Sequence, residues 1–415
     1  MEKKELSRLL CDFISEKQIS ETLFEKLSAE DWDGLLKLAI RFKVSGLFNR
    51  EIRIRNYPAS LIPERIRTKL REEYRNIAVL NTGLFFDAEA ILKSFEDNLL
   101  KVIALKGFSI AKKNYGDIGL RPMSDIDLLV KEKDLVKAGK ILLGMGYKQD
   151  FPDWDKLLKT HHHLPPFTNN RGTIIELHWN IIPPDNKIKP DIEGLWERAD
   201  LIKLNNFNVF CLSEEDLFLH LCIHACVHLQ TGIDLIPFCD IAALIKKSGD
   251  KIDWKIIRER SFGWGGQKCV YLILLMVSEI LGVKLSEKIM SGLKPIDYKN
   301  VFFEEALEQL FEINPTSQQT VNRIGEFFQI IKIEGLKAKI NLLLKKAFPS
   351  KEILSRFYPV SVSSRKIYLC YLFRLKRLVI YYSKILFHLI LRDKSVMKAL
   401  YQSNRGEAVS AWMFS

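Results

Sequence analysis

Residues 99–130 have the sequence LLKVIALKGFSIAKKNYGDIGLRPMSDIDLLV, and this stretch predicts two strands joined by a helical connection. Residues 99–105 are rich in branched apolar side chains, which is typical of a short buried strand. Residues 109–116 predict a short helix, and residues 125–130 alternate acidic and apolar side chains as a second strand does. The same reasoning predicts a third strand at 173–179, TIIELHW.

The segments before and after these strands in the sequence have apolar residues at helical spacing. Pro63 suits the first turn of a helix, where its missing N–H costs nothing, and the pattern predicts one long helix from there to Phe95. Further helices are predicted at 133–147, from Ser213 to 348, and at 365–395. The sequence therefore predicts an α+β fold, with a small mixed-sheet core flanked by N-terminal and C-terminal helical regions. The expected segments are 1–79, 80–212, 213–350 and 351–415.

The composition of the chain is that of a globular protein. Of its 415 residues, 47% are hydrophobic and 27% charged, which excludes a mainly disordered, collagen-like or disulfide-stapled protein. Seven cysteines are scattered without a C-x-x-C pair, which favours free thiols in a reducing compartment. The first twenty residues lack the apolar core of a secretory signal, and no apolar run is long enough for a conventional membrane span. We therefore expect a cytoplasmic protein.

The net charge of +12 is concentrated at the C-terminal end. Residues 331–415 carry a net charge of +13, whereas the first 330 residues carry −1. The helix predicted at 365–395 has an apolar stripe made of Tyr368, Leu369, Leu372, Leu375, Val379, Tyr382, Leu386 and Ile390. We expect this stripe to dock on the helices at 215–345. An anionic surface at the inner face of the membrane is the alternative partner, and nucleic acid is not expected.

Two acidic residues of the second predicted strand indicate a cation site. Asp125 and Asp127 are two positions apart, so both side chains lie on the same face of the strand. Glu176 and His178 have the same parity on the third strand. If these strands are neighbours, three carboxylates converge, and they repel one another unless a cation lies between them. Oxygen ligands of this kind favour Mg²⁺.

The connection before the second strand is suited to phosphate. Gly107 allows close approach of an anion to the backbone, and the helix that begins beyond it presents free N–H groups, so that Gly107 and Ser109 are candidate phosphate contacts. Lys106 and Arg121 are candidate partners of a triphosphate, with salt bridges to the acidic cluster as the alternative. Two metal ions beside such a phosphate site fit phosphoryl or nucleotidyl transfer.

These residues resemble a known group of proteins. The string LKGFSIAKKNYGDIGLRPMSDIDLLV, followed by IIELHWNI and LSEEDLFLHLCIHACVH, is similar to the uncharacterised nucleotidyltransferase branch of the DNA polymerase beta superfamily. The resemblance implies a mixed sheet of three to five strands, a nucleoside triphosphate donor such as ATP, and Mg²⁺, with two ions expected. It names neither the nucleobase nor the acceptor.

The function expected from residues and resemblance together is Mg²⁺-dependent transfer of a nucleoside monophosphate to an unidentified small-molecule, glycan or protein acceptor. Asp125, Asp127 and Glu176 are the expected metal-binding and catalytic residues. His178 is a candidate nucleotide contact, with a structural hydrogen bond as the alternative. The alternative is a catalytically inactive nucleotide-binding module that regulates or scaffolds an envelope or natural-product biosynthetic cluster, with the C-terminal helix as a peripheral membrane anchor.

The remaining histidines have less specific patterns. His220, His224 and His228 recur every four residues on one face of a predicted helix. Three residues on one helix cannot by themselves supply the tetrahedral ligands of a Zn²⁺ site, so we expect them to pack against the sheet. His161–His163 lie in an irregular stretch at 148–172, either as a loop over the site or as solvated surface.

Overall fold

The structure is a computed structural model, and it describes the chain apart from residues 16, 18, 56, 59, 150–157, 159–160, 205–206, 230–233, 313–334, 352–353, 355–357, 359, 361–363 and 392–405. The chain divides into two units. The larger unit contains residues 1–312 and 410–415, and the smaller unit contains residues 313–409. The four-segment division expected from the sequence stays a prediction.

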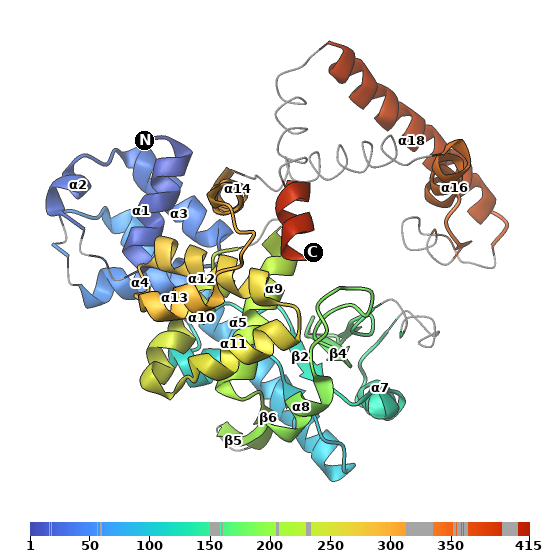
Figure 1. The fold of residues 1–415 in the computed structure, drawn as a ribbon, viewed down its shortest axis with the longest axis horizontal. Coiled ribbons are helices and arrows are strands. Elements are labelled where there is room, and N and C mark those ends of the chain that lie inside the picture. Colours follow the sequence, from blue (N-terminus) through green and yellow to red (C-terminus); the bar gives the residue numbers. More distant parts are fainter. Residues whose placement is uncertain are drawn as a thin grey trace. The chain divides into compact units, whose positions relative to one another are not determined.

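The larger unit is built around a mixed six-stranded sheet with the order β3-β4-β2-β1-β6-β5. Figure 1 labels β2, β4, β5 and β6 of this sheet. Its strands are β1 (Ile103–Ala104), β2 (Ile126–Leu129), β3 (Phe167–Thr168), β4 (Ile174–His178), β5 (Asp200–Leu204) and β6 (Phe207–Cys211). The predicted α+β fold is confirmed, and β1, β2 and β4 are the three predicted strands. The expected three to five strands are too few, because β3 is a two-residue strand and the β5–β6 pair was not recognised.

The register of the central strands positions the site. β2 and β4 run parallel, with Asp127 opposite Glu176 and Leu128 opposite Leu177. β1 pairs antiparallel with β2 and parallel with β6. All four residues of β2 are buried, as expected for a strand covered on both faces. The two predicted strands that carry the acidic residues are therefore direct neighbours.

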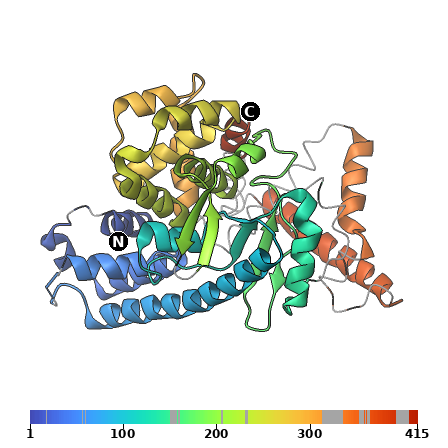
Figure 2. The same cartoon turned by 90° about the horizontal axis from the view of Figure 1, so that it is seen from below.

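The long helix α5 (Glu64–Asp97) begins directly after Pro63, as predicted, and runs along one side of the sheet (Figure 2). Its C-terminal half supplies the buried residues Leu84, Phe85, Ala88, Ile91, Leu92 and Phe95. These belong to the same hydrophobic cluster as Leu128 of β2 and Leu177 of β4. The cluster also includes Leu135 of α7 (Leu135–Gly144), which follows a short 3₁₀ turn at Glu132–Asp134.

Other helices of the larger unit pack around this centre. The N-terminal ones are α1 (Lys3–Ile14), α2 (Glu21–Glu25), α3 (Ala29–Arg41) and α4 (Ser45–Ile54). After the connection come the short α6 (Phe108–Ile110), a π-helical turn (Ala111–Tyr115) and α8 (Ile192–Glu197). The later ones are α9 (Glu214–Leu229), α10 (Ile236–Ser248), α11 (Trp254–Gly263), α12 (Gln267–Leu281), α13 (Glu287–Leu293) and α14 (Asn300–Glu312), with a 3₁₀ turn at Gly249–Lys251. α1 packs on α12, which joins the first and last parts of the unit.

The smaller unit contains α16 (Leu336–Ala347) and α18 (Ile367–Ile390). The Tyr371 hydroxyl donates to the Pro349 carbonyl at 2.7 Å, and Arg374 Nε donates to the Lys346 carbonyl at 2.9 Å. Its buried cluster contains only Leu354, Ile367 and Cys370 among the described residues.

The helix predicted at 365–395 therefore exists, but its inward face differs from the expected one. Five members of the predicted stripe are exposed, namely Tyr368, Leu369, Leu372, Leu375 and Val379. The side chains of Leu386 and Ile390 lie outside what the structure describes. Docking of this helix on residues 215–345 stays a prediction. Among the described residues, none of the helices is both long and apolar enough to cross a bilayer.

Candidate active site

A cavity of about 480 Å³ lies where the sheet meets α9 and α10. Its lining comes from the β1–α6 connection, the segment that enters β2, the ends of β2 and β4, and the two helices. Lys106, Gly107, Arg121, Asp125, Asp127, Glu176 and His178 all line it. Seven of the eight residues predicted from the sequence to form the site therefore meet in one cavity.

Asp127, Glu176 and His178 form the centre of this cavity. Because β2 and β4 are parallel and in register, one ligand atom from each residue lies within 4.8 Å of the others. His178 Nε2 lies 3.1 Å from Asp127 Oδ1 and 3.4 Å from Glu176 Oε2. Leu177 and Trp179 point the other way into the core, as the alternation of a strand requires.

Charge compensation holds the Asp127 carboxylate ionised. Burial alone would raise the pKa of Asp127, but Lys106 and the hydrogen bond from His178 outweigh it and hold that pKa far below its ordinary value. Burial would likewise lower the pKa of His178, but hydrogen bonds to Asp127 and Glu176 raise it. Burial acts to raise the pKa of Glu176, and the bond from His178 brings it below the ordinary value.

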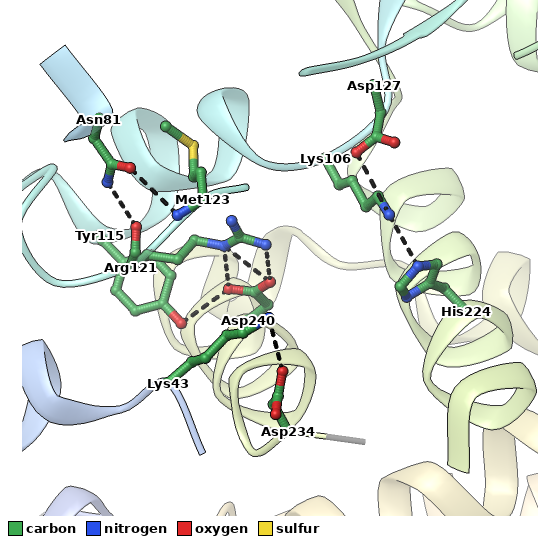
Figure 3. A network of polar contacts seen from close by, with 10 residues as sticks. All are labelled: Lys43, Asn81, Lys106, Tyr115, Arg121, Met123, Asp127, His224, Asp234 and Asp240. Atoms are coloured by element: carbon green, nitrogen blue, oxygen red, sulfur yellow. Dashed lines mark hydrogen bonds and ion pairs between the residues drawn. The ribbon is translucent and has the colours of Figure 1, made fainter. Parts of the chain in front are cut away.

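Lys106 bridges the acidic centre and α9. Its Nζ lies 3.4 Å from Asp127 Oδ2 and donates to His224 Nε2 at 2.9 Å (Figure 3). Burial first, and then the charge of Lys106, push the pKa of His224 well below its ordinary value, so its ring is a neutral acceptor. Lys106 thus forms the salt bridge to the acidic cluster that was the alternative in the sequence analysis, with His224 as a second partner, and its contact with a triphosphate stays a prediction.

Asp125 lies one residue before β2 and lines the same cavity. Burial raises its pKa, and the neighbouring charge of Asp127 raises it further. Its carboxylate does not belong to the group formed by Asp127, Glu176 and His178. The structure therefore places two predicted carboxylates at the centre and the third beside it.

The structure places the two candidate phosphate contacts, Gly107 and Ser109, differently. Gly107 lines the cavity and has a φ of 67°, a left-handed conformation that favours glycine. Ser109 is buried and does not line this cavity, and its hydroxyl interacts with the thiol of Cys211. The structure thus does not bring Ser109 to the predicted phosphate position, because the short helix turns its side chain toward β6.

Arg121 lines the cavity but is held by a carboxylate that sequence reasoning did not single out. Arg121 Nε donates to Asp240 Oδ1 at 2.9 Å, and Nη2 donates to Oδ2 at 2.8 Å (Figure 3). The Tyr115 hydroxyl donates to the same carboxylate at 3.0 Å. Asn81 of α5 donates to the Arg121 carbonyl at 2.8 Å and accepts from the Met123 N–H at 3.3 Å. Hydrogen bonds therefore hold the segment before Asp125 to both α5 and α10.

The histidines form a wall of the cavity. His220, His224 and His228 of α9 all line it, with ring centroids of the last two 4.4 Å apart. His220 is 2% exposed, and neither ring nitrogen has a hydrogen-bond partner among the described residues. Burial, followed by the charge of Lys106, lowers the pKa of His220 to about 3. The histidine face of α9 borders the site, and its expected packing against the sheet stays a prediction.

The residues at 161–163 are fixed to β4. The His162 carbonyl accepts a hydrogen bond from the Trp179 N–H at 3.0 Å. The backbone of His163 forms an isolated antiparallel β-bridge with that of His178. His162 and His163 both line the cavity, and His163 Nδ1 lies 4.0 Å from Glu176 Oε2. His162 and His163 therefore lie beside the site, and the role of this segment as a loop over it stays a prediction.

The donor set fits a divalent cation. Asp127 Oδ2 is fully buried and accepts no hydrogen bond from a described residue. The ion pair with Lys106 balances its charge, and the oxygen keeps lone pairs that a cation can use. Two carboxylates and one imidazole nitrogen lie within reach of a single ion. A second ion, expected from the sequence, would need Asp125 and stays a prediction.

Sequence reasoning missed Asp240 and Asn81, which hold the segment leading to β2. Nothing in the sequence links Arg121 to a carboxylate so far along the chain, because only the tertiary fold brings α10 to it. The four-residue spacing of His220, His224 and His228 did carry a usable signal, since it places all three on one helix face.

The comparisons with known proteins agree with this geometry. A family model described as uncharacterised nucleotidyltransferase matches residues 28–282, which include all six strands and every residue of the cavity lining. Comparisons with curated proteins and with solved structures find no match. The match covers more than half of the sequence and confirms the resemblance carried by the two acidic strands: this chain belongs to the uncharacterised nucleotidyltransferase family.

Proposed function

We propose that the protein transfers a nucleoside monophosphate from a nucleoside triphosphate to an acceptor group, and that the reaction depends on Mg²⁺. The observation that carries the proposal is the convergence of Asp127 and Glu176, with Asp125 beside them, in one cavity that also holds Lys106. A triphosphate carries several negative charges that must be neutralised when it binds. Carboxylates that hold a cation, next to the fixed ammonium group of Lys106, suit this task. Membership of a nucleotidyltransferase family supports the same reaction class.

Each residue has a part in this proposal. Asp127 and Glu176 hold the cation, which when bound would neutralise charge on the phosphates and on the leaving pyrophosphate. Lys106 lies next to the phosphates, and the left-handed turn at Gly107 allows the backbone to approach them closely. The acceptor oxygen attacks the α-phosphorus, the bond to the β-phosphate oxygen breaks with its electron pair, and Glu176 takes the acceptor's proton.

Pyrophosphate release tests the reaction. We would incubate the full chain with each of the four ribonucleoside triphosphates, MgCl₂ and a small-molecule cell extract, and follow pyrophosphate and the mass of new products. The expected result is Mg²⁺-dependent pyrophosphate release that stops on addition of EDTA. Asp127→Asn should abolish it, because a carboxamide cannot replace a buried anionic ligand. Glu132→Gln is the matched control, since Glu132 is an exposed carboxylate just beyond β2.

Calorimetric titration separates binding from catalysis. Asp127→Asn should weaken Mg²⁺ binding at least about tenfold, whereas Glu132→Gln should bind the ion as the wild type does. Nucleotide binding without pyrophosphate release in any extract would favour the alternative, a non-catalytic nucleotide-binding module. Full turnover by a folded Asp127→Asn protein would refute the assignment of the site.

A further inference from the structure

The smaller unit presents apolar side chains that its own described core does not cover. On α18, Leu369, Leu372, Phe373, Val379 and Ile380 are 45–63% exposed. Their spacing of three to four residues places them on one broad side of the helix. The opposite side carries Ile367 and Cys370, which are buried against Leu354. Within its own unit the helix is therefore apolar on both sides, with its wider apolar face outward.

α16 has the same character. Leu336, Ile340, Leu343 and Leu344 are all at least 43% exposed, and their spacing also places them on one side of that helix. Lysines at 337 and 339 lie next to them in the sequence. Two helices of one small unit thus expose apolar faces, whereas soluble monomers keep contiguous apolar patches small. Such a pair of faces indicates a binding surface.

The charge around these faces has one sign. Between Glu352 and Asp393 the chain has eight Lys and Arg and no Asp or Glu. Lys366 and Arg377, both exposed, lie by their spacing along the edge of the apolar face of α18. Lys376 falls within the face, and its long side chain can carry its ammonium group to a polar boundary. An apolar face bordered by basic residues is the pattern of helices that lie in a membrane interface.

We propose that the smaller unit binds an anionic phospholipid bilayer through the outward faces of α16 and α18, with both helices lying in the plane of the membrane. Apolar side chains enter the boundary between headgroups and acyl chains, and the lysines and arginines contact anionic headgroups. An anionic bilayer matches both the apolar area and the single sign of charge. Nucleic acid would use the charge but leave the leucines and valine exposed, so we favour the bilayer.

Vesicle flotation with the full chain tests this proposal. The probes are vesicles of phosphatidylcholine alone and of phosphatidylcholine mixed with phosphatidylglycerol. We expect binding to the mixed vesicles that weakens with added salt, and little binding to neutral ones. Leu372→Gln with Val379→Gln should reduce binding at least about tenfold, because it removes two inserted side chains without changing charge. Lys366→Gln with Arg377→Gln should reduce binding about tenfold and flatten the salt dependence.

The matched control is Val79→Gln with Leu80→Gln, which changes two side chains that are 71% and 67% exposed on α5 of the other unit. It should bind vesicles as the wild type does. All variants are compared by circular dichroism and by gel filtration with light scattering. No binding of the wild type to mixed vesicles, or equal binding by the Leu372/Val379 variant, would overturn the proposal. So would a dimer, or an RNA complex, that the Leu372/Val379 variant disrupts while vesicles stay unbound.

Discussion

Replacing Asp240 by Asn should destabilise the larger unit more than any surface charge change. Asp240 is 1% exposed and Arg121 8% exposed, and the guanidinium donates to both carboxylate oxygens. The variant leaves a buried cation without its counter-ion, which costs about 3–5 kcal/mol. A domain of this size has a free energy of unfolding of about 5–15 kcal/mol, so the loss is a large fraction of the total.

A double-mutant cycle measures this cost. Urea unfolding followed by tryptophan fluorescence gives the free energy of unfolding for wild type, Asp240→Asn, Arg121→Met and the double variant that combines Arg121→Met with Asp240→Asn. Each single variant should lose at least about 3 kcal/mol, and the double variant should lose less than the sum, because no unpaired charge remains. Single losses below about 1 kcal/mol, or losses that simply add, would refute the reasoning. In that case Arg121 would be free to serve the nucleotide, the role predicted from the sequence.

Two further predictions concern stability. Gly46→Ala should destabilise the larger unit by about 1–3 kcal/mol in urea unfolding, because its methyl group would lie 2.8 Å from the Leu120 carbonyl oxygen. Gly83→Ala on the open side of α5 has no atom within 4 Å and should stabilise by about 0.5–1 kcal/mol, so equal effects would contradict the packing argument. His220 has a pKa of about 3 in the folded protein, below its ordinary value. As the pH falls, His220 of the unfolded chain is therefore protonated before that of the folded protein, and the free energy of unfolding decreases. Between about pH 7.5 and pH 5 this should cost about 2 kcal/mol, and His220→Gln should reduce the pH dependence by that amount.

The parts of the site that depend on the local pattern of a strand could be predicted from the sequence. Two-residue alternation fixes which face of a strand a side chain occupies, so Asp127 could be paired in advance with Glu176 and His178. The register that sets them opposite each other depends on a long connection whose path the sequence does not determine. Ser109 was misplaced because the direction of its side chain depends on how the short helix Phe108–Ile110 is oriented, which spacing alone does not determine.

Other parts of the fold could not be predicted for a related reason. The ion pair between Arg121 and Asp240 needs tertiary packing, since neither residue has a local signal for the other. The side of the C-terminal helix that is buried within the smaller unit could not be predicted, because both of its sides are apolar, and its docking on residues 215–345 stays a prediction. Within the smaller unit, the side that carries Ile367 and Cys370 packs against Leu354.

The packing of α1 has a practical consequence for fragment design. Leu10 and Phe13 are fully buried, and the Phe13 ring lies 4.8 Å from that of Phe48 and 5.4 Å from that of Phe24. The region matched by the family model begins only at residue 28, after this helix. An expression clone trimmed to the matched region would lose Phe13 and Phe24 and leave Phe48 without the ring of Phe13. Recombinant fragments for crystallisation should therefore retain the chain from its first residue.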